Sequence, residues 1–210
     1  MSACAQTIYI VRHGERLDFV DRLWRRSNPE RSYDPPLTDK GLLQAKAVGQ
    51  EIKSKTLDIK HVISSPFSRC LQTAMCISET LGSQSVGISN GLCEVMNPNC
   101  YVTRRVILPT PQLESLNVTL DDSGIDCPLP HFPEQFRDAF HRYASAFEAA
   151  ADKHWPHNLV LVTHGYGVQR ALNLGLSTVA AFQVEYCGYV VLERESKRPQ
   201  WKLGESVGAS

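Results

Sequence analysis

The chain has 210 residues, a hydrophobic content of 42% and a formal net charge of +0. This length predicts one domain, and the balanced charge argues against nucleic-acid or membrane partners. Seven cysteines without close pairs indicate reduced thiols, and we expect neither a secretory leader nor a membrane span, so the sequence predicts a cytoplasmic protein.

The first predicted element is a strand over residues 8–11, a run of β-branched and aromatic residues. It ends in Arg12 and His13, which are costly to bury without a partner. Gly14 follows, where the chain can turn sharply and approach a ligand closely. Polar groups at the carboxyl end of a strand in an open α/β sheet are typical of a ligand site.

Helix and strand patterns then alternate along the chain. Residues 17–36 form an irregular charged segment, and Thr38 is a candidate N-cap for an amphipathic helix that runs through Lys55. A short strand over 61–63 and a helix over 67–81 follow. We expect an anionic partner or a structural salt bridge for Arg69, because its charge in the first turn of that helix opposes the helix dipole.

A third predicted strand covers residues 86–88, and periodicity then weakens from 95 to 133, where six prolines fall. This segment is too long for a plain connection in a compact domain, so we expect a cap over the site. The later predicted elements are helices over 134–153 and 167–174 and strands over 159–162, 189–192 and 201–203. The alternation predicts an α/β fold, a three-layer sandwich with a mostly parallel central sheet and helices on both faces.

The predicted strand over 159–162 ends in His164 and Gly165, which repeats the His-Gly ending of the first strand. Two buried strands with the same polar ending are hard to explain by packing alone. If the two strands lie side by side, His13 and His164 converge at one edge of the sheet.

The candidate polar set consists of Arg12, His13, Arg16, Arg69, Glu94 and His164. Three arginines and two histidines at strand ends suit a doubly charged oxyanion, and phosphate is the natural one. Neighbouring cations lower the pKa of His13, so its neutral imidazole can attack phosphorus. A carboxyl beside a phosphate dianion has a raised pKa, so Glu94 can give its proton to the leaving alkoxide.

Several motifs in order resemble those of the histidine phosphatase (phosphoglycerate mutase-like) superfamily, branch 1. The resemblance covers nearly the whole chain except 95–133, and its motifs are Arg-His-Gly-Glu-Arg at 12–16, Asp-Pro-Pro-Leu-Thr-Asp-Lys-Gly at 34–41, Ser-Ser-Pro-Phe-Ser-Arg-Cys at 64–70 and Thr-His-Gly at 163–165. It implies a phosphoglycerate mutase-like fold in one domain over 1–210, with 95–133 as the inserted cap.

The resemblance also implies roles for the candidate residues. His13 becomes the phosphoryl acceptor, Glu94 the proton donor, and the phosphate pocket is formed by Arg12, Arg69 and His164. The motifs look closest to the phosphatase domain of the suppressor-of-T-cell-receptor-signalling (TULA) proteins, in which the second arginine, here Arg16, also binds phosphate. Glu15 and Glu79 compete with Glu94 for the role of acid.

We therefore expect a phosphatase that hydrolyses phosphomonoesters of small molecules or phosphoproteins, phosphotyrosine proteins among them, without a cofactor or a metal. The sequence leaves open whether the chain forms a homodimer. The alternatives are a phosphoglycerate mutase or sugar bisphosphatase on the same fold, and a catalytically inactive module that binds phospho-ligands. Arg16 stands where mutases usually have serine, which argues against the mutase. A Gly-x-Ser-x-Gly match at 87–91 is also found in esterases, although here no helix pattern follows Ser89 directly.

Overall fold

The computed structural model describes residues 5–56, 58–82, 85–100, 119–120, 127–178, 181, 183–197 and 200–209. In this part of the chain, strands pair into a sheet in the order β4-β3-β2-β5-β1-β6-β7. The strands are β1 (Gln6–Arg12), β2 (Ile59–Ser64), β3 (Ser85–Ile88), β4 (Thr119–Leu120), β5 (Asn158–Thr163), β6 (Val184–Arg194) and β7 (Lys202–Ala209). Pairs from β4 to β1 are parallel, whereas β6 is antiparallel to both β1 and β7. The prediction of a mostly parallel sheet is confirmed.

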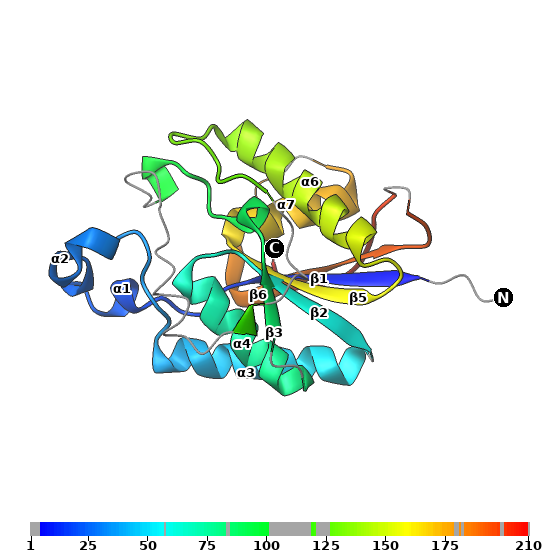
Figure 1. Ribbon diagram of the computed structural model, residues 1–210, viewed down its shortest axis with the longest axis horizontal. Coiled ribbons are helices and arrows are strands. Elements are labelled where there is room, and N and C mark those ends of the chain that lie inside the picture. The colour runs from blue at the N-terminus through cyan, green and yellow to red at the C-terminus, as the bar shows by residue number, and fades with distance from the viewer. Residues whose placement is uncertain are drawn as a thin grey trace.

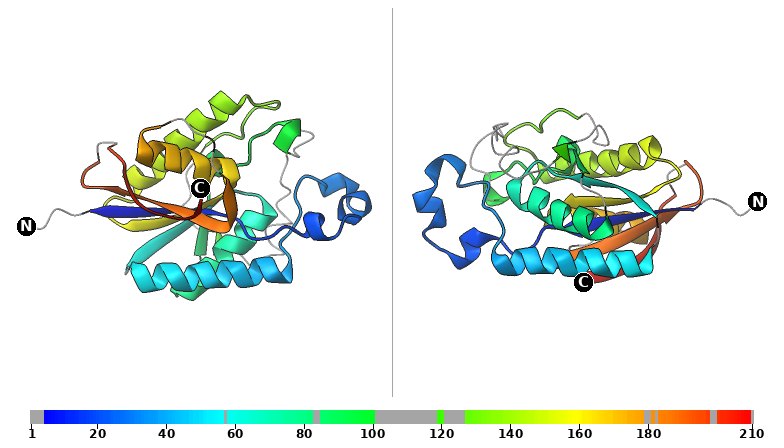
Figure 2. Two further views of the ribbon diagram at one scale, coloured as in Figure 1. Left: turned by 180° about the vertical axis from the view of Figure 1, so that it is seen from behind. Right: turned by 60° about the horizontal axis from the view of Figure 1, so that its bottom comes forward.

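Helices cover both faces of this sheet (Figures 1 and 2). One face carries α3 (Asp39–Lys55) and α4 (Ser68–Leu81), and the other carries α6 (Phe136–Lys153) and α7 (Gly165–Leu176). The predicted three-layer sandwich is therefore confirmed. Within the described residues, no helix combines the length and apolar character that crossing a bilayer requires.

Alternate residues of the central strands supply two separate hydrophobic cores. Ile8 and Ile10 of β1 point toward α6 and α7, while Tyr9 and Val11 point toward α3 and α4. Successive side chains of a strand face opposite sides of the sheet, so a continuous apolar run is buried on both. β5 divides its leucines and valines between the two cores in the same way. This double burial fixes the carboxyl ends of β1 and β5.

Local signals account for the helix boundaries near the site. The hydroxyl of Thr38 accepts a hydrogen bond from the backbone N–H of Gly41 at 2.9 Å, which caps α3 as predicted. α4 is capped from outside its own sequence, because Asp34 accepts from the backbone N–H and the hydroxyl of Ser68 at 2.8 and 2.6 Å. The predicted end at Gly82 is confirmed by its φ of 87°.

Three predictions need correction or lie outside the described residues. Residues 17–36 are not wholly irregular, since α1 (Leu17–Val20), α2 (Trp24–Ser27) and a 3-10 turn, η1 (Pro29–Arg31), form within them. α1 and α2 project from the sandwich in Figure 1. The predicted helix over 134–153 begins at Phe136. Of the expected cap, residues 101–118 and 121–126 lie outside the description.

Candidate active site

His13 and His164 lie together at the carboxyl ends of neighbouring parallel strands, as predicted. The β1–β5 register pairs Arg12 with Thr163, so the two histidines follow at the same level. Their ring centroids are 5.4 Å apart. The turn after His13 packs tightly on the start of α3, where a Cβ on Gly14 would lie 2.5 Å from the carbonyl oxygen of Gly41. Glycine at 14 therefore lets the chain pass α3.

The hydrogen bond of His13 defines which ring nitrogen carries a lone pair. Nδ1 lies 2.8 Å from the carbonyl oxygen of Gly14, and a carbonyl only accepts, so Nδ1 carries the proton. Nε2 is then the nitrogen with the lone pair. Burial, followed by the charges of Arg69 and Arg12, holds the pKa of His13 well below its ordinary value of 6.5. The ring is therefore neutral at physiological pH.

His164 is held by two side chains. Arg69 Nη2 lies 3.2 Å from Nδ1, and a guanidinium only donates, so Nδ1 accepts this hydrogen bond. The other ring nitrogen, Nε2, donates to the hydroxyl of Ser65 at 2.9 Å. Burial and the charge of Arg69 hold the pKa of His164 well below 6.5. Ser65 was not predicted as a site residue, although it follows β2, which pairs with β5.

Two of the buried arginine nitrogens that lack hydrogen-bond partners among the described residues belong to the site: Arg12 Nε and Arg69 Nε. The carboxylates nearest Arg69 are distant, with Asp34 at 3.9 Å and Glu94 at 3.8 Å. An unsatisfied buried N–H is costly, particularly on a charged group. A bound oxyanion would satisfy these donors. The expected anionic partner of Arg69 is thus only partly supplied by the protein itself.

Arg12 is positioned by the start of β6. It donates to the carbonyl oxygen of Val184, and its guanidinium lies 4.4 Å above the ring of Tyr186. The Tyr186 ring is also 6.0 Å from that of His13. Tyr186 was missed by sequence reasoning, because it belongs to no motif and reaches the site through an irregular stretch of β6. In that stretch Cys187 has a φ of 56° and donates its backbone N–H to the carbonyl oxygen of His13.

Arg16 lies buried at the entrance to α1. Its Nε and Nη2 donate to the two carboxylate oxygens of Asp18 at 3.0 and 2.9 Å. Arg25 of α2 also donates to Asp18, through Nε at 2.7 Å. Burial, followed by the charge of Arg69, lowers the pKa of Arg16 to about 10, while Asp18 acts in the opposite direction. Asp18 was not predicted, and it shows that part of the 17–36 segment supports the site.

Glu94 lies beside His164, which fits the position predicted for a proton donor. Its Oε2 is 3.4 Å from His164 Nδ1, and its Oε1 accepts from the backbone N–H of Val95 at 3.0 Å. Burial raises the pKa of Glu94, against the opposing effect of Arg69. Of the competing carboxylates, Glu15 binds Thr38 and Lys40 at the start of α3, and Glu79 is exposed on α4.

Ser89, the candidate nucleophile of an esterase, and the thiol of Cys70 are both buried in structural positions. Ser89 is 1% exposed, and its hydroxyl accepts from the backbone N–H of Gly91 in a 3-10 turn, η2 (Asn90–Leu92). This is not the exposed strand-to-helix elbow of an esterase. Cys70 packs against His164, and burial raises the pKa of its thiol above the ordinary value. The thiol therefore stays neutral.

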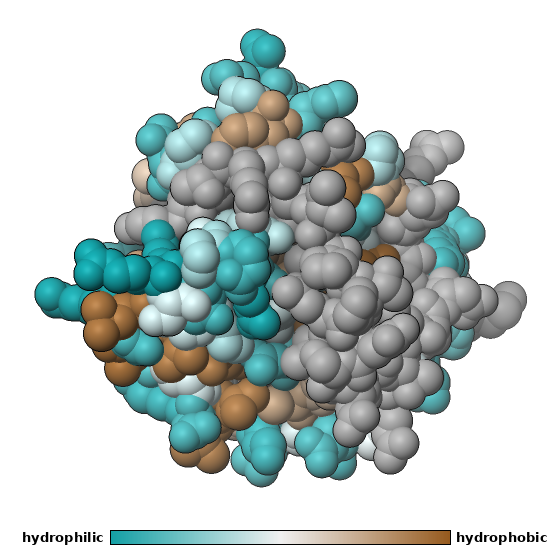
Figure 3. Space-filling model, turned by 60° about the vertical axis from the view of Figure 1, so that its left-hand side comes forward, coloured by the Kyte–Doolittle hydropathy of each residue, from teal (hydrophilic) through white to brown (hydrophobic). Residues whose placement is uncertain are grey.

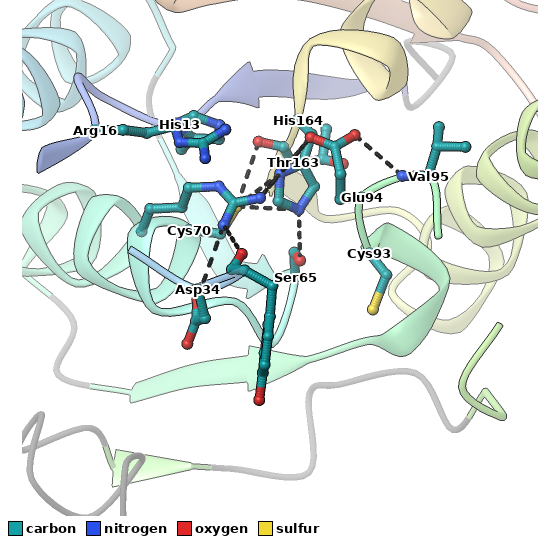
Figure 4. A network of polar contacts seen from close by, with 12 residues as sticks. His13, Arg16, Asp34, Ser65, Cys70, Cys93, Glu94, Val95, Thr163 and His164 are labelled. Carbon is teal, nitrogen blue, oxygen red and sulfur yellow. Dashed lines mark hydrogen bonds and ion pairs between the residues drawn. The ribbon is translucent and has the colours of Figure 1, made fainter. Parts of the chain in front are cut away.

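A cleft of about 500 Å³ opens beside this network. Arg12, Arg16 and Glu94 are among the residues that line it. Figure 4 shows His13, Glu94 and His164 close together, with Asp34 farther from Glu94. Arg69 approaches Asp34 through Nη1 and Glu94 through Nη2. In the described part of the chain, no group of three histidine, cysteine or acidic side chains is arranged to hold a metal ion.

Fold and site together define an α/β protein with buried arginine and histidine side chains at the carboxyl edge of its parallel strands. A family model described as the histidine phosphatase superfamily (branch 1) matches residues 8–205. The chain belongs to this superfamily, and the predicted family is confirmed.

Known proteins of related sequence and structure agree with this assignment. An ecdysteroid-phosphate phosphatase of Drosophila melanogaster is 34% identical over a match covering 42% of this chain and 16% of that protein, so the chain spans a small part of its length. A probable phosphoglycerate mutase, GpmB, of Escherichia coli O1:K1 is 29% identical and covers 75% of this chain and 69% of its own. The crystal structure of an ecdysone phosphate phosphatase from Bombyx mori, in complex with tungstate, gives a TM-score of 0.71 at 20% identity, covering 95% and 92% of the two chains. Its likeness supports the fold.

Proposed function

We propose that this chain is a phosphatase that hydrolyses phosphomonoesters through a covalent phosphohistidine on His13. One observation carries the proposal: the Nδ1 proton of His13 is bound by the Gly14 carbonyl, which leaves the Nε2 lone pair of a neutral, buried ring. Arg12 and Arg69, with unsatisfied buried N–H groups, flank the same site. A neutral nucleophile beside unsatisfied cationic donors suits attack on a phosphate ester.

In the first step, His13 Nε2 forms a bond to phosphorus and the bond to the ester oxygen breaks. Glu94 gives its proton to that oxygen, so the alcohol leaves neutral. Arg12, Arg16 and Arg69 stabilise the charge on the phosphoryl oxygens, with His164 held beside them. In the second step, water attacks phosphorus, its proton returns to Glu94, and the bond to His13 breaks. Phosphate then leaves and the enzyme is restored.

The substrate class is proposed from the names of the relatives and from the motifs. The names of the relatives favour phosphorylated small molecules, since one acts on ecdysteroid phosphates and another is a probable phosphoglycerate mutase. The resemblance to the TULA phosphatase domain predicts phosphotyrosine proteins as substrates, and this substrate class stays a prediction. The likeness to GpmB favours the alternative of a phosphoglycerate mutase. No observation of the described site favours it. We further propose one domain over 1–210, with 95–133 as the cap.

Acid- and alkali-quench trapping tests the proposal. The protein is mixed with p-nitrophenyl phosphate labelled in its phosphoryl group, and the quenched protein is assayed for bound label. We expect an acid-labile, alkali-stable phosphoenzyme in the wild type and neither label nor turnover in His13→Ala. His141→Ala is the matched control, because His141 is exposed on α6. Turnover by a folded His13→Ala variant would overturn the proposal.

A further inference from the structure

The cleft extends well beyond the groups that a phosphate needs. Past Arg12, Arg16 and Glu94, its described lining is apolar or uncharged, and consists of Phe19, Asn99, Cys100, Gly165, Tyr166, Gln169, Ala181, Gln183 and Val184. A volume of about 500 Å³ is that of a pocket for a drug-sized ligand. Within the described lining, a charged alcohol would find no counter-charge other than the groups that bind the phosphate.

Two aromatic side chains stand at this cleft, each supported from behind. Phe19 of α1 lies under the guanidinium of Arg16, 4.6 Å from its ring centroid. Tyr166, in the first turn of α7, packs its ring edge-on against Phe136 with centroids 5.1 Å apart. Cation–π and edge-to-face contacts hold rings in fixed orientations. Both rings are therefore preorganised to contact a flat apolar group.

The exposed apolar side chains concentrate near the same cleft. The structure describes six large hydrophobic residues that are exposed, and four of them line the cleft or lie within four residues of Phe19: Phe19 at 46%, Val20 at 64%, Leu23 at 61% and Tyr166 at 36%. Figure 3 views the side from which α1 and α2 project, where apolar side chains stand among polar ones. Gathered exposed apolar surface marks a binding site, and Phe19 belongs both to this surface and to the lining of the cleft.

We infer that the substrate is a low-molecular-weight phosphate ester of a bulky, uncharged ring alcohol. This inference rests on the proposed phosphatase function and names the substrate class of the same site. The apolar body of the alcohol lies between Phe19 and Tyr166 and extends toward Val20 and Leu23. Moving an apolar ring out of water onto such a surface favours binding by on the order of tenfold or more. Small charged alcohols gain nothing from this surface.

The test compares two primary alkyl esters, n-propyl phosphate and naphthylethyl phosphate. Their leaving alcohols are similarly basic, so a difference in kcat/KM reports apolar contact rather than chemistry. We expect the naphthylethyl ester to be preferred on the order of tenfold or more. The preference should fall severalfold in Phe19→Ala and in Leu23→Ser. Leu43→Ser is the matched control, because Leu43 is 68% exposed on α3 and does not line the cleft.

Calorimetric binding of both esters to the His13→Ala variant separates this inference from the proposed function. If neither ester is hydrolysed by the wild type, the phosphatase function fails, yet the preference in affinity still supports the ring-alcohol site. Equal affinities and equal kcat/KM values would overturn the inference. So would a phosphoseryl peptide with charged flanks, also a primary alkyl ester, that has a higher kcat/KM than the naphthylethyl ester.

Discussion

Asp18 binds Arg16 through both carboxylate oxygens, and the Asp18 side chain is fully buried between Arg16 and Arg25. A bidentate pair of this kind fixes the plane of the guanidinium. Because the pair occupies Nε and Nη2, Asp18 determines which edge of Arg16 faces the cleft. Under the proposed function, Asp18 is thus a positioning residue that acts on the phosphate through Arg16.

Asp18→Asn should weaken phosphate binding, because an amide cannot accept both hydrogen bonds of the guanidinium. We expect KM for p-nitrophenyl phosphate and the inhibition constant of inorganic phosphate to rise on the order of tenfold, with a smaller change in kcat. In an Arg16→Ala background the same change should have little further effect. Additive losses in the double variant would refute the coupling, and Glu79→Gln serves as the surface control.

Glu94→Gln should slow the hydrolysis of alkyl phosphates far more than that of p-nitrophenyl phosphate. An alkoxide needs a proton to leave, whereas nitrophenolate leaves without one, and general acid catalysis contributes on the order of 10²–10⁴-fold. Steady-state rates on the two substrates give the comparison. Glu15→Gln is the control, since Glu15 is bound to Thr38 and Lys40. Equal losses on both substrates would remove Glu94 from the role.

The pH profile of kcat/KM should be bell-shaped, with its limbs assigned to two residues. His13 must be neutral, and its lowered pKa places the acid limb below pH 6.5. Glu94 must be protonated, and its raised pKa places the basic limb above pH 4.5. Activity then falls as pH drops through the pKa of His13 and as it rises through that of Glu94. A basic limb that persists unchanged in Glu94→Gln would contradict this assignment.

Activity should survive chelation of divalent metals. Arg12, Arg16 and Arg69 supply the positive charge that a metal ion provides in other phosphatases. Turnover of p-nitrophenyl phosphate is measured before and after dialysis against EDTA, and then with added magnesium or zinc. We expect the same rate in all samples. A loss on dialysis that zinc or magnesium reverses would disprove the prediction.

The sequence predicted those site residues that stand at strand ends or in short motifs. His13 and His164 each stand two residues after the end of an apolar run, so they meet once β1 and β5 are neighbours. Arg69 was recognisable because a cation in the first turn of a helix needs an anionic partner. In these cases the informative pattern lies within a few residues of the chain.

Asp18, Ser65 and Tyr186 were not predictable in the same way. Asp18 belongs to a four-residue helix, which is too short to show periodicity. Ser65 contacts His164 because β2 and β5 are paired, and strand order is not written in local sequence. Tyr186 reaches Arg12 through an irregular stretch of β6, which depends on tertiary contacts. The fold class was predictable, whereas these supporting contacts required the assembled sheet.

The position of β1 in the sheet has a consequence for synthesis of the chain. Tyr9 pairs with Val160 on one side and with Val191 on the other, so β1 is made first while its neighbours follow about 150 residues later or more. At ribosomal rates this delay lasts roughly 8–30 seconds. Throughout that time the nascent β1 has two unpaired edges and apolar side chains on both faces. Until β5 and β6 are made, this segment of the growing polypeptide is therefore exposed to self-association.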